Sequence, residues 1–123
     1  MIRILYVNDD PINGTLGARL REAGVEVEIL VAKKEVVARE YLAEADRIDV
    51  VLMDFDMGKG RAQSTVATGL VQAFVDAGFG KSKKMLVANS RGQGSNQELE
   101  DAGCSHTFHP EEFNRFADYL RNR

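Results

Sequence analysis

The sequence is poor in residues that define particular classes of protein. Its 123 residues include no tryptophan, two prolines and a single cysteine, Cys104. One cysteine cannot form a disulfide within the chain, which excludes a disulfide-stapled fold. We therefore expect the protein to occupy a reducing compartment.

Two further absences concern membranes and nucleic acids. No apolar run approaches the roughly 18 residues that a transmembrane helix needs. The chain begins directly with an apolar run and lacks the profile of a signal peptide. The net charge is −3, whereas general nucleic-acid binders usually carry a basic face. We expect a cytoplasmic protein without membrane or nucleic-acid partners, folded as a single domain over residues 1–123.

Five short apolar runs recur along the chain, at residues 2–7, 25–31, 50–53, 85–88 and 105–108. The first, third and fourth are nearly continuous, as in strands buried on both faces, whereas the second alternates with glutamates and indicates an edge strand. Apolar residues at helical spacing lie between and after the runs. This alternation, repeated five times, predicts an α/β fold with a parallel sheet and helices on both faces.

Local signals indicate where the helices begin and end. A glycine just past a helix end is a common stop, and three Ala-Gly pairs fit that role: Ala23-Gly24, Ala77-Gly78 and Ala102-Gly103. Pro110 suits the first turn of the last helix. The spacing of Ser95 and Glu98 predicts a capping box at the start of the fourth helix. Residues 58–68, with two early glycines, are interpreted as a long loop.

Acidic side chains follow two of the predicted strands. Asp9 and Asp10 come just after the first strand, and Asp54 directly follows the third. Ligands of open parallel sheets bind at the carboxyl ends of the strands, so neighbouring strands would bring these carboxylates together. Like charges this close repel unless a cation is present, and Mg²⁺ prefers such oxygen ligands. An aspartate there can also act as a nucleophile and form an aspartyl phosphate.

The segments ILYVNDD, VVLMDFDM and FHP, with the three Ala-Gly pairs, resemble the receiver domain of two-component response regulators over essentially the whole chain. The resemblance implies a flavodoxin-like strand order 2-1-3-4-5 and phosphorylation of Asp54. It also implies that Asp9, Asp10, Asp54 and the backbone carbonyl of Asp56 hold Mg²⁺. The phosphoryl donor would be a histidine kinase, a phosphotransfer protein or a small acyl phosphate. A downstream protein would dock on the face formed by the fourth helix, fifth strand and fifth helix.

Several positions depart from the pattern of that family. Receivers usually carry Thr or Ser after the fourth strand; here Asn89 or Ser90 fills that place, or Ala88 leaves it empty. His109 stands before a proline where receivers usually carry Lys. A neutral imidazole offers only a hydrogen bond, and a protonated one would make the site sensitive to pH. His106 occupies the position of the aromatic switch residue, usually Tyr or Phe.

Three functions are open on the sequence alone. The first is a phospho-accepting receiver, which is not an enzyme beyond its own phosphorylation and dephosphorylation. The second is a pseudo-receiver that binds proteins independently of phosphate, which His109 favours. The third follows from Asp54-Phe55-Asp56, which resembles the first motif of haloacid-dehalogenase-type phosphatases, although that motif normally lies near the N-terminus. Cys104, His106 and His109 fit no standard zinc spacing.

Overall fold

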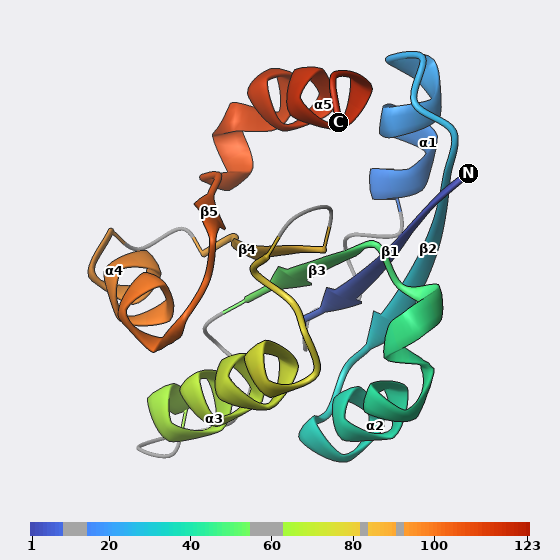
Figure 1. Ribbon diagram of the computed structural model, residues 1–123. Helices are drawn as coiled ribbons and strands as arrows, with labels where there is room; N and C mark the ends of the chain where they lie inside the picture. Colours follow the sequence, from blue (N-terminus) through green and yellow to red (C-terminus); the bar gives the residue numbers. More distant parts are fainter. Residues whose placement is uncertain (9–14, 55–62, 82–83, 91–92) are drawn as a thin grey trace.

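The fold follows the predicted alternation of strands and helices. The computed structural model describes residues 1–8, 15–54, 63–81, 84–90 and 93–123 (Figure 1). The strands are β1 (Ile2–Val7), β2 (Val27–Ala32), β3 (Val50–Met53), β4 (Met85–Ala88) and β5 (His106–Thr107). The α-helices are α1 (Leu16–Glu22), α2 (Glu35–Glu40), α3 (Gln63–Asp76), α4 (Gln93–Ala102) and α5 (Phe113–Arg121). A 3-10 helix (Tyr41–Arg47) follows α2, and a 3-10 turn (Pro110–Glu112) precedes α5.

The five strands form one parallel sheet in the order β2-β1-β3-β4-β5. The fold class and the strand order implied by the resemblance are therefore confirmed. Every residue of β3 and β4 is buried, because helices cover both faces of the central strands. This burial explains why these runs are apolar without alternation. β2 lies at one edge, as its alternating pattern predicted.

Helices cover the sheet on both faces (Figure 1). Side chains of α2, α3 and α4 pack on one face, where Phe74 and Leu5 belong to the same buried cluster. Side chains of α1 and α5 pack on the other face, where Leu20, Phe116 and Ile4 are buried together. Consecutive residues of β1, Ile4 and Leu5, thus point to opposite cores, as the alternation of side chains along a strand requires. In the part of the chain that is described, no helix is both long and apolar enough to cross a bilayer.

The glycine stops are confirmed, whereas two other local predictions are wrong. In all three Ala-Gly pairs the glycine follows a helix and has a positive φ, between 83° and 135°. The fourth helix begins at Gln93, so Ser95 and Glu98 lie inside it and form no cap. The predicted loop over residues 58–68 is also too long, because α3 already begins at Gln63.

Candidate functional site

The carboxyl ends of the strands form a continuous row of residues. One residue past each of the strands β1, β3, β4 and β5, a backbone N–H donates to the carbonyl oxygen of the last residue of the neighbouring strand. The donors are Asn8 (3.0 Å), Asp54 (2.9 Å), Asn89 (2.9 Å) and Phe108 (3.0 Å). The sheet hydrogen bonding therefore fixes the backbone of Asp54 between Asn8 on one side and Asn89 on the other.

Asp54 lies at the end of the central strand, partly exposed. β1 and β3 are neighbours, and the chain continues from β1 to β2 on one side and to β3 on the other. Such a reversal of strand order is where open α/β sheets bind ligands. A partly exposed carboxylate at this place can bind a cation or act as a nucleophile.

Three of the four predicted metal ligands, Asp9, Asp10 and Asp56, lie outside the described residues. Among the residues that are described, no group of three His, Cys, Asp or Glu side chains is placed to hold a metal ion. Asp54 supplies the oxygen chemistry that Mg²⁺ prefers. The magnesium site is therefore still a prediction.

Asn89 and Ser90 have different surroundings after β4. Asn89 lies beside Asp54 in the row, and its Nδ2 donates to the carbonyl oxygen of Phe108 at 2.6 Å. Ser90 is buried, and its backbone N–H and carbonyl both bond to the side chain of Asn96 on α4, at 2.8 Å each. The side chain next to Asp54 across the β3–β4 register is therefore that of Asn89.

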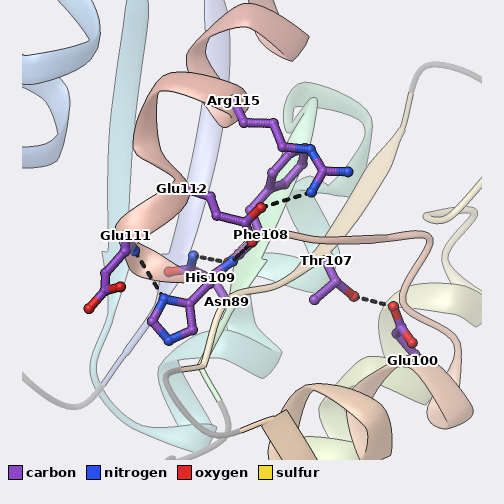
Figure 2. Close-up of polar contacts among 8 residues, drawn as sticks. All are labelled: Asn89, Glu100, Thr107, Phe108, His109, Glu111, Glu112 and Arg115. Atoms are coloured by element: carbon purple, nitrogen blue, oxygen red, sulfur yellow. Dashed lines mark hydrogen bonds and ion pairs between the residues drawn. The ribbon is translucent and has the colours of Figure 1, made fainter.

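His109 follows Phe108, the last residue of the row, and caps the 3-10 turn (Figure 2). Its backbone N–H donates to Oε1 of Glu112 at 2.9 Å, and its Nδ1 accepts from the backbone N–H of Glu111 at 3.2 Å. The hydrogen bond from His109, followed by that from Arg115, lowers the pKa of the Glu112 carboxyl. This reciprocal capping needs an acceptor at position 109, and a lysine ammonium has none. His109 therefore lacks the fixed positive charge of the usual lysine, and its side chain caps the turn before α5.

Sequence reasoning missed Glu112 and Asn96. Glu112 stands three residues after His109, which is the spacing of a capping box. The signal was present, but histidine is not among the usual N-cap residues. Asn96 had no such signal, because its partner is a backbone segment six residues earlier that only the α4 position brings within reach.

His106, at the predicted aromatic switch position, bridges β5 and α5. Its Nε2 lies 2.5 Å from the hydroxyl of Tyr119, and its Nδ1 lies 2.9 Å from Oγ of Ser105. Burial lowers the pKa of His106. The ring stacks parallel to Phe108 with centroids 6.5 Å apart, while Tyr119 is 42% exposed. An aromatic cluster thus fills the space between β5 and α5.

The predicted docking face lies over α4, β5 and α5. A polar hollow on this face contains His109 and three glutamates: Glu100, Glu111 and Glu112. Thr107 donates to Glu100 and links β5 to α4 (Figure 2). The face therefore presents acidic side chains from α4 and from the turn before α5.

No family model matches the sequence, and no curated protein matches it. Solved structures do match over nearly the full length. A receiver domain protein from Clostridium thermocellum is 18% identical with a TM-score of 0.74, covering 99% of this chain and 93% of its own. A CheY-like protein (tadZ) from Pseudomonas aeruginosa is 17% identical with a TM-score of 0.74, covering 100% and 95%. The beryllofluoride-activated receiver domain of RstA from Klebsiella pneumoniae is 23% identical with a TM-score of 0.66, covering 97% and 98%. The chain has the fold of a response-regulator receiver domain.

Proposed function

We propose that this chain is a signalling receiver of a two-component or phosphorelay system, phosphorylated on Asp54. The position of Asp54 carries the proposal. It is a partly exposed carboxylate at the carboxyl end of the central strand, at the point where strand order reverses. The receiver fold over the whole chain supports the same function.

The proposed reaction is the transfer of a phosphoryl group to the Asp54 carboxylate. One of its oxygens attacks the phosphorus of a phosphohistidine or a small acyl phosphate, a new P–O bond forms, and the donor's P–N or P–O bond breaks. Asp9, Asp10, Asp54 and the backbone carbonyl of Asp56 would hold Mg²⁺, and the ion would supply positive charge to neutralise the phosphoryl oxygens. Later attack of water on the acyl phosphate restores the carboxylate and releases phosphate.

Asn89 of the row, and His109 directly after Phe108, orient the phosphoryl group in this proposal. Asn89 lies next to Asp54 and keeps one N–H of its amide in addition to the one donated to Phe108. His109 follows directly on the same edge and offers a ring N–H. The Asn89 amide carries no charge, so it positions a phosphoryl oxygen through a hydrogen bond alone.

The partners follow from this chemistry. A cytoplasmic histidine kinase or phosphotransfer protein supplies the phosphoryl group. A downstream protein then binds the face over α4, β5 and α5. The cluster of His106, Phe108 and Tyr119 joins β5 to α5 and is placed to transmit a change at the row to this face.

A pseudo-receiver that acts without phosphate is the second candidate. One observation favours it: Nδ1 of His109 already accepts a hydrogen bond within the turn, and the ring replaces the lysine charge of typical receivers. Removal of that charge weakens binding of a phosphoryl group. The phosphatase interpretation receives no comparable support, because the matched structures are receivers.

Beryllofluoride, which mimics a phosphoryl group, distinguishes the two candidates. Mg²⁺ and then beryllofluoride are titrated into the wild type, Asp54→Asn and the control Asp76→Asn, while amide shifts are followed by NMR. Asp76→Asn makes the same charge change at the exposed end of α3. We expect shifts at Asp54, Asn89 and β5 in the wild type and the control but not in Asp54→Asn. Mg²⁺ binding without a beryllofluoride response would contradict the phospho-accepting function and support the pseudo-receiver.

A further inference from the structure

The turn after β5 contains a reciprocal pair of hydrogen bonds around His109 (Figure 2). The backbone N–H of His109 donates to Oε1 of Glu112, and the backbone N–H of Glu111 donates to Nδ1 of the ring. The second carboxylate oxygen of Glu112 accepts from Arg115 at 2.8 Å. Glu112 is therefore held from α5 and from the turn at the same time.

These contacts determine which ring nitrogen carries the proton. A nitrogen that accepts a hydrogen bond has no proton of its own, so the neutral ring must carry its proton on Nε2. The nitrogen that faces the turn is thereby fixed as the acceptor. Nε2 lies on the opposite side of the five-membered ring, away from the backbone of Glu111 (Figure 2).

The orientation of the ring depends on Glu112. The Glu111 N–H reaches Nδ1 only while the chain folds back in the 3-10 turn, and the Glu112 carboxylate closes that turn on the backbone of His109. The hydrogen bonds from His109 and Arg115 lower the pKa of Glu112, which keeps the carboxylate ionised and a strong acceptor. His109 also lines a hollow together with Asn89, the residue that follows β4 beside Asp54.

We propose that Glu112 is a positioning residue that locks His109 in the tautomer protonated on Nε2, and that this Nε2–H is the donor that His109 presents to a phosphoryl oxygen. The second half of this statement rests on the proposed function; the tautomer lock does not. The lock replaces the geometric freedom of a lysine with one fixed donor direction. Glu112 acts through His109 and does not itself touch the ligand.

Long-range ¹H–¹⁵N NMR spectra, which distinguish protonated from unprotonated ring nitrogens, test the lock in the free protein. We expect Nδ1 of His109 to be unprotonated and Nε2 protonated in the neutral wild type. Glu112→Gln keeps an oxygen acceptor and should retain this pattern. Glu112→Ala removes the acceptor and should give exchange between the two tautomers. Glu111→Gln is the matched control, because it changes the same charge one residue away while keeping the backbone donor.

A beryllofluoride titration with Mg²⁺ then tests the donor role in the same proteins. We expect Glu112→Ala to bind beryllofluoride roughly two- to tenfold more weakly than the wild type does. The affinities of Glu112→Gln and Glu111→Gln should stay close to that of the wild type. A wild type protonated on Nδ1 overturns the proposal without any variant. An unchanged tautomer and unchanged affinity in Glu112→Ala also overturn it. A Glu112-dependent tautomer in a protein that never responds to beryllofluoride supports the lock and refutes the donor role together with the proposed function.

Discussion

The side-chain amide of Asn89 donates a 2.6 Å hydrogen bond to the backbone carbonyl of Phe108 on the neighbouring strand. It extends the β4–β5 pairing beyond the backbone bond from Phe108 to Ala88. β5 is only two residues long, so this side-chain contact is a large part of what holds its carboxyl end. His109 is the next residue in the chain.

Replacement of Asn89 by alanine removes this bond and leaves the Phe108 carbonyl without its side-chain donor. We expect the free energy of unfolding in urea to fall by about 1 kcal/mol, with amide shifts at residues 108–112. The control is Asn122→Ala, which removes a side-chain bond to Asp118 at the exposed end of α5 and should change stability by less than about 0.5 kcal/mol. Equal losses in the two variants would contradict a special role for Asn89.

His106 should make stability depend on pH. Burial lowers its pKa from the ordinary 6.5, so the unfolded chain binds the proton more readily than the folded protein. The contribution of His106 to the free energy of unfolding is therefore complete above about pH 6.5. It declines as the pH falls through that value toward the pKa of the folded protein. The measurement compares urea unfolding of the wild type and His106→Phe across this range. The free energy of unfolding of the variant should rise relative to that of the wild type as the pH falls. A difference between the two proteins that does not change with pH would contradict the lowered pKa.

Cys104 should be unreactive in the folded protein. Burial, followed by the charge of Glu100, raises the pKa of its thiol to about 12, and the thiolate is the reactive form. Native protein treated with iodoacetamide at neutral pH should show no added mass, whereas protein unfolded in urea should be alkylated once per chain. Rapid alkylation in native buffer would show that this end of α4 opens to solvent.

Gly103 should tolerate a side chain less well than Gly24. Both residues follow a helix with positive φ, 135° and 83°, a conformation that costs other residues roughly 1–2 kcal/mol. A Cβ at Gly103 would also lie 2.6 Å from Cγ2 of Val75, while one at Gly24 meets no atom within 4 Å. We expect Gly103→Ala to lose about 1–3 kcal/mol more than Gly24→Ala in urea unfolding. Equal losses would show that α3 and α4 can separate to make room.

The sequence by itself determined the features that depend on neighbouring residues. The continuous apolar runs of β3 and β4 predicted buried central strands, and the glycines after α1, α3 and α4 predicted the helix ends. These signals are local, because burial on both faces and a positive φ each restrict which residues a position accepts. Asp54 was also identified locally, since it directly follows a buried strand.

Tertiary structure decided what depends on residues distant in the chain. α4 begins at Gln93 and not at the predicted cap, and this places Asn96 where its side chain binds both backbone groups of Ser90. Likewise, Nζ of Lys84 donates to the carbonyl oxygens of Ala45 and Ile48, which lie 39 and 36 residues earlier in the chain. No local pattern contains such partners, because sheet and helix packing bring them together only after the chain has folded.

The candidate site also combines features that the sequence predicts with features that only the tertiary structure sets. The sequence placed Asp54 directly after a buried strand, and the resemblance to receivers directed attention to His109 and to Asn89 or Ser90 after the next strands. The sheet register decided that Asn89 lies beside Asp54. The turn decided that Nδ1 of His109 accepts a hydrogen bond from the backbone N–H of Glu111. This bond forms only when the chain folds back so that the Glu111 backbone faces the ring.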